Sequence, residues 1–364
     1  ISYLFIILFL KNSWKYHLHC QMILRTLLQS YQLYKIKGVK LMEVFENLKA
    51  NLVGKNVRIV LPEGKEPRIL QATKRLVNET DVIPVLLGKP EKIKIYLEIE
   101  GITEGYEVID PDHYAKFDDM VAALVERRGG KMTEEEARKT LREDVNYFGV
   151  MLVYMGLVDG MVSGALHSTA ATVRPALQII KTRPNVTRTS GAFLMVRGNE
   201  RYLFGDCAIN INPDADALAE IAINSAITAK MFGIEPKIAM LSYSSKGSGF
   251  GENVDKVVAA TQRAHELRPD LEIDGELQFD AAFHPQTAAL KAPGSKVAGQ
   301  ATVFIFPSIE AGNIGYKIAE RLGGFSAVGP VLQGLNKPVN DLSRGCSSDD
   351  VYNLTLITAA QAVH

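Results

Sequence analysis

Cysteine is scarce in this sequence of 364 residues, and its distribution excludes some kinds of site. Cys20, Cys207 and Cys346 are far apart, with no CxxC pair and no histidine beside them at ligand spacing. Isolated cysteines of this kind argue against a structural zinc site and favour a reducing compartment. We therefore predict a cytoplasmic location.

A long hydrophobic run is also missing. The apolar stretch Ile1 to Leu10 has about half the length needed to cross a bilayer. It lacks the preceding basic residues and the following cleavage site of a secretory signal. We interpret residues 1–41 as an extraneous or disordered leader and "MEVFENLK" as the true start, with a membrane-associated anchor as the alternative.

Excess positive charge is absent beyond that leader. Residues 1–41 contain six Lys or Arg and no acid, so the rest of the chain has 35 basic residues against 41 acidic ones. Nucleic-acid backbones demand a basic surface, which this mildly acidic body does not offer. We expect no nucleic-acid partner and no membrane partner.

Apolar strands and helical segments alternate after the leader. The stretches 57–62 and 82–88 are apolar and rich in branched side chains, which predicts buried strands separated by an amphipathic helix. Two amphipathic helices should follow, the second across residues 133–156 with a Thr-x-x-Glu capping box at its start. The stretch 158–165 predicts another strand. This alternation is typical of α/β proteins.

The alternation of strands and helices is interrupted at "SGAFLMVRGNERYLFGDCAIN". Two apolar runs joined by Gly198 and Asn199 predict an antiparallel hairpin. Helices and strands then alternate again, from a helix at 214–232 to a helix containing "NIGYKIAERL". We predict a two-domain α/β/α fold with helices on both faces of its sheets and a central cleft, where small-molecule sites are common.

The length of the chain also favours two domains. We expect domain I to comprise residues 42–186 and 331–364, with the last helix, after Ser347, returning to it. Residues 187–330 should form domain II.

Two polar segments follow predicted strands, where α/β proteins bind ligands. In "GALHSTAATVRPALQ", Ser168, Thr169 and Arg174 would suit an anion, although an ordinary helix cap with a surface arginine explains them equally well. In "SYSSKGSGFGEN", Ser245, Lys246 and three glycines would suit a phosphate. A flexible loop is the alternative there, and no nucleotide-binding motif is matched.

A third segment, "FPSIEAGNIGYK", places Asn313, Tyr316 and Lys317 at the start of a predicted helix. A solvated helix start would need no function. These three residues remain candidates for substrate binding.

The fourth segment, "DLSRGCSSDD", holds a hydroxyl, a guanidinium, a thiol and carboxylates in one turn. Ser347 and Asp350 have the spacing of a capping box, in which Asp350 would accept backbone N–H bonds and have a lowered pKa. A general base would instead need a raised pKa. The residues alone leave both interpretations open.

Together, "HSTAATVRPALQ", "LFGDCAINI", "SYSSKGS", "GNIGYK" and "VNDLSRGCSSDD" resemble the phosphate acetyltransferases (phosphotransacetylases) in their order. The resemblance runs from Met42 nearly to the end, and it is to the short members without regulatory domains. It implies two α/β domains around a cleft, a fold shared with isocitrate and isopropylmalate dehydrogenases, and a homodimer.

The resemblance also implies a reaction, acetyl-CoA and phosphate giving acetyl phosphate and CoA. Asp350 resembles the base that takes the thiol proton, Ser343 the hydroxyl that orients the thiol, and Arg344 the cation near the acyl phosphate. Direct thiolate attack in a ternary complex is implied, with CoA, acetyl phosphate and phosphate as substrates. No metal and no redox cofactor is implied.

Substrate binding is implied for Arg127, with Arg128 as a one-residue ambiguity, and for Arg174 as a second cleft arginine. Ala171 stands where many relatives have Asp, which puts the hydrogen bonding of that loop in doubt. The other candidate contacts for CoA or phosphate are Ser168, Thr169, Ser245, Lys246, Asn313, Tyr316 and Lys317.

Cys207 and Cys346 are expected near the cleft as non-nucleophilic residues. An electropositive turn beside Cys346 would lower its pKa and permit an acetyl-cysteine intermediate, which is the alternative to direct transfer. Three rival functions remain: a phosphate butyryltransferase, a metal- and NAD(P)-dependent decarboxylating dehydrogenase, and a binding module for CoA or a sugar phosphate.

Overall fold

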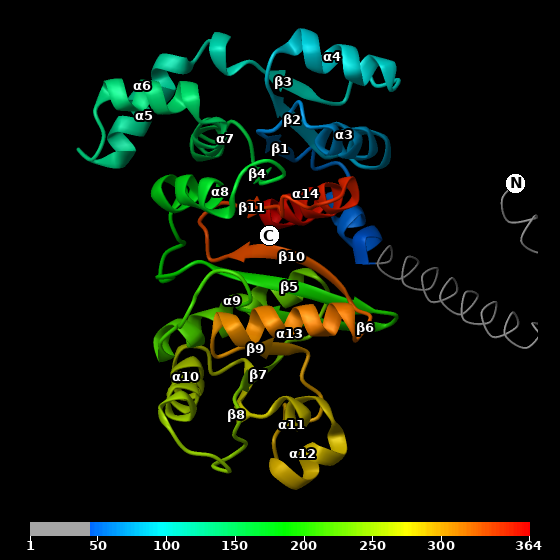
Figure 1. Ribbon diagram of the computed structural model, residues 1–364, viewed down its shortest axis with the longest axis vertical. Helices are drawn as coiled ribbons and strands as arrows, with labels where there is room; N and C mark the ends of the chain where they lie inside the picture. Colours follow the sequence, from blue (N-terminus) through cyan, green and yellow to red (C-terminus); the bar gives the residue numbers. More distant parts are fainter. Residues whose placement is uncertain (1–43) are drawn as a thin grey trace, which may run out of the picture.

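The computed structural model describes residues 44–364, which form two β-sheets covered by helices (Figure 1). Our interpretation of residues 1–41 as a leader concerns residues outside this range. Within residues 44–364, no helix has the length and apolar character needed to cross a membrane.

The first sheet is parallel throughout, in the order β11-β4-β1-β2-β3. Ile59 and Leu61 pack into one layer of helices and Val60 into the other, so both faces of the sheet are buried. Such strands are apolar at nearly every position, as the sequence indicated. The strands are β1 (Arg58–Leu61), β2 (Ile83–Leu87), β3 (Glu107–Ile109), β4 (Gly160–Ser163) and β11 (Val339–Asp341).

Helices cover both faces of this sheet. One layer contains the helical residues 44–52, α3 (Pro67–Glu79), α4 (Pro90–Ile99) and α14 (Ser348–Val363). The other contains α5 (Phe117–Arg128), α6 (Glu134–Glu143), α7 (Val145–Tyr154), α8 (Thr169–Pro175) and the π-helical η4 (Ala176–Ile180). A short 3-10 helix, η3 (Pro111–His113), follows β3.

The second sheet is mixed, in the order β10-β5-β6-β9-β7-β8. β5 and β6 are antiparallel and Arg197 pairs with Glu200, which confirms the predicted hairpin. The strands are β5 (Ser190–Arg197), β6 (Glu200–Gly205), β7 (Lys237–Leu241), β8 (Glu272–Leu277), β9 (Val303–Ile305) and β10 (Ser326–Gln333).

Helices again cover both faces. α9 (Ala215–Met231) and α10 (Glu252–Leu267) lie in one layer. α11 (Phe279–Phe283), α12 (Pro285–Lys291) and α13 (Ile309–Arg321) lie in the other. The predicted α/β class, with helices on both sides of each sheet, is confirmed.

α14 joins the two halves of the molecule. It packs on α3 and β4 of the first half and on β10 of the second, as Figure 1 shows. One apolar core runs through this junction and includes both Val351 of α14 and Val331 of β10. Residues 331–333 still pair with β5, so the domain limit that we predicted at residue 331 falls inside a strand of the second sheet.

The prediction of a single helix across residues 133–156 is wrong. The capping box at its start is present, but Asp144 has an extended backbone and separates α6 from α7. Its carboxylate accepts hydrogen bonds from the backbone N–H groups of Asn146 at 2.9 Å and Tyr147 at 3.2 Å. Aspartate favours helix starts over helix interiors for this reason.

Several elements were not predicted at all: α4, β3, β8, α11, α12, β10 and β11. β3 and β11 have three residues each, too few for an alternation pattern to be recognised. Their place in the sheets comes from pairing with longer neighbours.

Candidate functional site

The central part of the site lies on the loops that follow two adjacent strands of the first sheet. β4 and β11 run parallel, with Ser163 paired to Asp341. The loops after them therefore leave the same edge of the sheet side by side. One loop leads to Thr169 at the start of α8, and the other carries Ser343 and Arg344 toward α14.

A pocket of about 400 Å³ lies between these loops, and we call it the junction pocket. Pro330 of β10 forms one wall, so the pocket lies where the second sheet meets the first half of the molecule. The structure thus brings three predicted residues together, Thr169, Ser343 and Arg344. The described lining is His167, Thr169, Pro330, Asp341, Leu342, Ser343 and Arg344.

Glu63 holds the first of the two loops. It follows β1, and only 5% of it is exposed. Its carboxylate accepts hydrogen bonds from the four backbone N–H groups of residues 164–167, at 2.7–3.1 Å, and lies 2.7 Å from His167 Nδ1. Such charge-assisted bonds are strong in a buried setting. Our sequence analysis missed this residue, although an acid directly after a buried strand is a visible signal.

Arg68 ties the two loops together. Its Nη1 donates to the carbonyl oxygens of Arg344 and Cys346, both at 2.9 Å, and its Nη2 donates to that of Ala165 at 3.0 Å. Glu66 holds the guanidinium from the other side, at 2.5 Å from Nε. The sequence indicated only that Arg68 belongs to an amphipathic helix.

Asp350 forms the predicted capping box at the start of α14. Its Oδ2 accepts hydrogen bonds from the backbone N–H of Ser347 at 2.8 Å and from the Ser347 hydroxyl at 2.9 Å. Ser347 Oγ in turn accepts from the Asp350 N–H at 3.2 Å. Asp350 is exposed and does not belong to the described lining of the junction pocket. Its role as a base stays a prediction.

Arg127 and Arg128 differ in what they contact. Arg127 donates from Nε and Nη2 to the carbonyl oxygens of Ile179 and Ile180, at 2.6 and 3.2 Å. Its guanidinium also lies 5.0 Å from the centre of the Tyr154 ring. These contacts hold Arg127 against the end of η4.

Arg128 makes fewer hydrogen bonds than Arg127 within the described residues. Its Nε is buried and has no hydrogen-bond partner within the described part of the chain. Burial raises the pKa of Tyr147, and the positive charges of Arg128 and Arg174 oppose this rise, so both guanidinium groups lie near that ring. Arg174 itself is exposed.

A second group of predicted residues lies in the other half of the molecule. Asn313 Nδ2 donates to the Cys207 carbonyl at 3.2 Å, and the Tyr316 ring stacks on Phe193 with centroids 4.1 Å apart. α13 starts earlier than predicted, after Ser308, so Asn313 and Tyr316 lie within the helix and not at its start. The physical reason is that Ser308 caps the helix.

Ser245 and Lys246 form a third group, between β7 and α10. Lys246 pairs with Asp274 and donates to the Gly275 carbonyl at 3.1 Å. Ser245 Oγ accepts from the Gln278 N–H at 2.9 Å. The described lining of the junction pocket includes neither this group nor the one around Asn313.

Comparison with known proteins identifies the family. The profile described as "Phosphate acetyl/butaryl transferase" matches residues 42–359. The chain belongs to this family. A curated phosphate acetyltransferase of Bacillus subtilis is 58% identical over 322 residues, which cover 88% of this chain and 99% of that protein. The predicted enzyme class, an acyltransferase of the phosphate acetyltransferase type, is confirmed.

Solved structures of phosphotransacetylases are also similar to this chain. The crystal structure of a phosphotransacetylase from Streptococcus pyogenes is 61% identical and superposes with a TM-score of 0.86, over 88% of this chain and 98% of that one. A phosphotransacetylase from Staphylococcus aureus is 55% identical with a TM-score of 0.84, covering 88% of this chain and 98% of that one.

The two described cysteines of this acyltransferase are free thiols buried in the protein. Burial raises the pKa of Cys207 well above its usual value, and the nearby Asp206 adds to the rise. Burial also raises the pKa of Cys346, and the Arg68 charge only partly opposes it. The electropositive turn proposed from the sequence therefore does not lower the pKa of Cys346.

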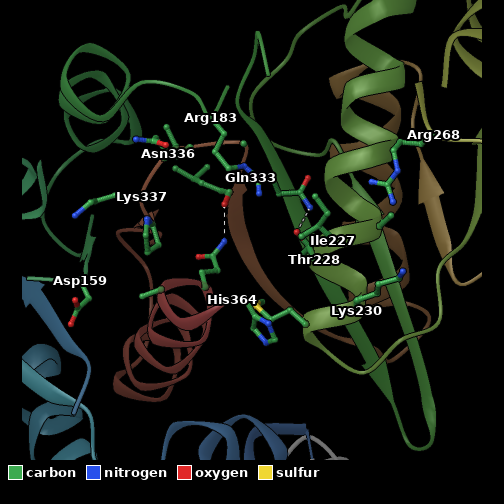
Figure 2. Close-up of a pocket in the computed structure, with 18 of the residues that line it drawn as sticks. Asp159, Arg183, Ile227, Thr228, Lys230, Arg268, Gln333, Asn336, Lys337 and His364 are labelled. Atoms are coloured by element: carbon green, nitrogen blue, oxygen red, sulfur yellow. Dashed lines mark hydrogen bonds between the residues drawn. The ribbon is translucent and has the colours of Figure 1, made fainter. Parts of the chain in front are cut away.

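Another pocket of the acyltransferase, about 660 Å³, lies elsewhere. Asp159 and Lys337, at the amino ends of β4 and β11, line it together with Arg183, Lys230 and Arg268 (Figure 2). Its described lining contains none of the predicted site residues. Within residues 44–364, no group of three or more His, Cys, Asp or Glu side chains is arranged to hold a metal ion.

Proposed function

We propose that this chain catalyses the reversible transfer of an acetyl group between acetyl-CoA and phosphate, by direct attack of the CoA thiolate on acetyl phosphate in a ternary complex. The observation that carries the proposal is the junction pocket, where Thr169, Ser343 and Arg344 meet at adjacent strand ends. A hydroxyl and a guanidinium are the groups that thiol orientation and an acyl phosphate require.

The catalytic roles that we propose are those of the family resemblance, and the arrangement around the junction pocket supports those of Ser343 and Arg344. Arg344 binds the phosphoryl oxygens and offsets the charge that develops on the acyl oxygen. Ser343 orients the thiol, and Asp350, on the first turn of α14, accepts its proton. Asp350 Oδ2 belongs to the capping box, so Oδ1 is the oxygen proposed to face the thiol.

Direct transfer is favoured over an acetyl-cysteine intermediate. A thiol with a raised pKa is a poor nucleophile at neutral pH, and both Cys207 and Cys346 are in this state. Transfer of an acetyl group from oxygen to sulfur changes no oxidation state, so no redox cofactor is required, and the charge of the phosphate is met by arginine without a metal.

CoA should be held by arginines outside the junction pocket. Arg128 and Arg174 both lie near Tyr147, and their positive charges suit the CoA phosphates. Arg127 is already engaged with two carbonyl oxygens, so we assign the CoA contact to Arg128. Ser168 and Thr169 add hydroxyls at the start of α8.

The residues of the second half would complete the substrate site from across the junction. Asn313, Tyr316 and Lys317 come from α13, and Ser245 and Lys246 from the loop after β7. Lys246 must leave Asp274 to bind a phosphate, which makes it the weakest of these candidates.

We also propose that the protein is a cytoplasmic homodimer that acts on small molecules. Free buried thiols suit a reducing compartment. For dimerisation, α13 exposes Ile314 and Ile318 on one face, with exposed fractions of 57% and 53%, and Leu322, which caps the end of the helix, is 86% exposed. A second copy covering this apolar face would remove it from water.

The function is tested with acetyl, propionyl and butyryl phosphate in parallel, in the presence of CoA. We expect thioester absorbance to rise fastest with acetyl phosphate. A pocket distinguishes one methylene by only about 1–3 kcal/mol, so slower turnover of the longer substrates is expected too. Thioester formation with none of the three would refute the proposal, and NAD(P)H formation from hydroxy acids would favour the dehydrogenase alternative.

A further inference from the structure

Asp341 lies in the wall of the junction pocket, at the end of β11. Its backbone pairs with Ser163 of β4, and only 2% of the residue is exposed. It lines the pocket beside Ser343 and Arg344. In the proposed function, Ser343 orients the thiol and Arg344 binds the acyl phosphate.

The Asp341 carboxylate differs from an ordinary structural carboxylate. Its Oδ1 is buried and makes no well-formed hydrogen bond among residues 44–364, and the same holds for Thr172 Oγ1. The Thr169 and Thr172 hydroxyls lie close enough to favour the charged carboxylate, but their geometry falls short of a full hydrogen bond to this oxygen. A Cβ on Gly164 would come within 2.6 Å of Oδ1, so glycine makes the room for this oxygen. A buried polar atom without a partner costs free energy and calls for a functional reason.

The pKa of the Asp341 carboxyl group is consistent with a functional role. Burial raises the pKa of Asp341 to about 6, the Thr169 and Thr172 hydroxyls oppose the rise, and the charge of Glu63 adds to it. A carboxyl group in this range exchanges protons near neutral pH, which an acid–base catalyst needs.

The reaction requires a second proton transfer besides that of the thiol. When sulfur attacks acetyl phosphate, the C–S bond forms, the C–O bond to phosphate breaks, and the bridging oxygen takes the electron pair. Unless a proton reaches that oxygen, phosphate must leave as a trianion, which is a poor leaving group. In the reverse direction, the attacking phosphate oxygen must lose the same proton.

We propose that Asp341 is the acid–base residue for phosphate: its carboxyl group donates a proton to the departing bridging oxygen, and its carboxylate accepts that proton when phosphate attacks the thioester. Asp350 takes one proton from sulfur and Asp341 gives one to oxygen, so the overall equation is balanced. The inference deepens the proposed function and rests on it.

Other charged groups face Asp341, and one of them is a rival. Arg344 is exposed at the pocket and positions the phosphoryl oxygens. Glu63 is held by backbone N–H groups of the neighbouring loop. His167 lines the same pocket, but its Nδ1 lies 2.7 Å from Glu63, which leaves only Nε2 to exchange a proton.

The test compares wild type, Asp341→Asn and His167→Gln by measuring kcat/KM in both directions from about pH 5 to 9. In the direction of thioester formation Asp341 must be protonated, so the wild-type rate should fall as the pH rises above about 6. Asp341→Asn should lower the rate about 100-fold and abolish this fall, because an amide does not titrate. His167→Gln should retain it.

Each other outcome overturns the inference. The inference is wrong if Asp341→Asn keeps a rate within about threefold of wild type, or if its rate still falls as the pH rises. It is also wrong if the fall in rate disappears in His167→Gln. Thr172→Val is a second check that leaves the carboxyl in place: loss of the opposing hydroxyl should shift the fall to higher pH, and an unshifted fall counts against Asp341. Inactivity of wild type would refute the proposed function instead.

Discussion

Four carboxylates of the described chain are buried close to strand ends, and three of them organise a polar loop. Glu63 holds residues 164–167, Asp206 accepts from the backbone N–H groups of residues 208–210, and Glu276 accepts from Ser244 Oγ and the Gly247 N–H. The loop of Glu276 contains the predicted Ser245 and Lys246, and the loop of Glu63 leads to the predicted Ser168 and Thr169. The fourth, Asp341, holds no loop in this way, and this contrast supports a chemical role for it.

Glu63→Gln tests this structural role at the residue scale. A neutral amide has one acceptor oxygen, so several N–H groups of the 164–167 loop lose their partner. We expect unfolding free energy to fall by about 2–3 kcal/mol in urea titration, and kcat to fall because Thr169 is no longer positioned. Glu104→Gln, at an exposed position, is the control and should change neither quantity. Equal stability of the two variants would contradict the role of Glu63.

At the scale of single elements, the start of α14 serves two purposes at once. Its capping box satisfies backbone groups that the first turn leaves without partners. The same turn carries Asp350, while Arg68 fixes the carbonyl groups just before it. A well-anchored helix start is a suitable support for a catalytic side chain, because a rigid element keeps the side chain in place.

Two substitutions in this turn separate the structural purpose from the chemical one. Ser347→Ala removes the cap hydroxyl and should lower the unfolding free energy by about 1 kcal/mol while kcat stays within a few-fold of wild type. Asp350→Asn should lower kcat about 100-fold and change KM for CoA much less, because the base acts only in the transition state. Urea unfolding and steady-state kinetics measure both. An active Asp350→Asn enzyme would leave Asp350 as a helix cap only.

At the scale of the whole molecule, the apolar core through α14 and β10 fixes the junction of the two halves. The junction pocket lies beside this core and takes walls from both halves. α13, on the second sheet, turns Tyr316 inward and leaves Ile314 and Ile318 exposed, together with Leu322 at its C-terminal end. An apolar helix face of this kind is expected to be covered in the working protein.

Ile318→Asp tests whether a second copy covers that face. A charge in the centre of a dimer interface loses its water without gaining a partner, so the dimer should dissociate. Sedimentation velocity should show a dimer for wild type and a monomer for Ile318→Asp. Ile95→Asp is the matched control, since Ile95 on α4 is similarly exposed, at 59%, and should leave the dimer intact. A dimer in both variants would place the interface elsewhere.

Many of the strands and helices, and the polar segments that follow the strands, could be predicted from the sequence alone. Long apolar strands, the hairpin at Gly198 and the capping boxes at Thr133 and Ser347 are local features, because neighbouring residues decide them. The order of the polar segments was enough to indicate the family that the comparisons confirm.

Which of these segments meet in space depends on the folded chain. Parallel pairing of β4 with β11 brings Thr169 beside Ser343, across more than 170 residues of chain. The fold also shows that Arg127 binds two carbonyl oxygens, whereas within residues 44–364 the buried Arg128 Nε and Asp341 Oδ1 make no well-formed hydrogen bond. Burial and long-range pairing depend on the whole fold, so no local pattern of residues could reveal them.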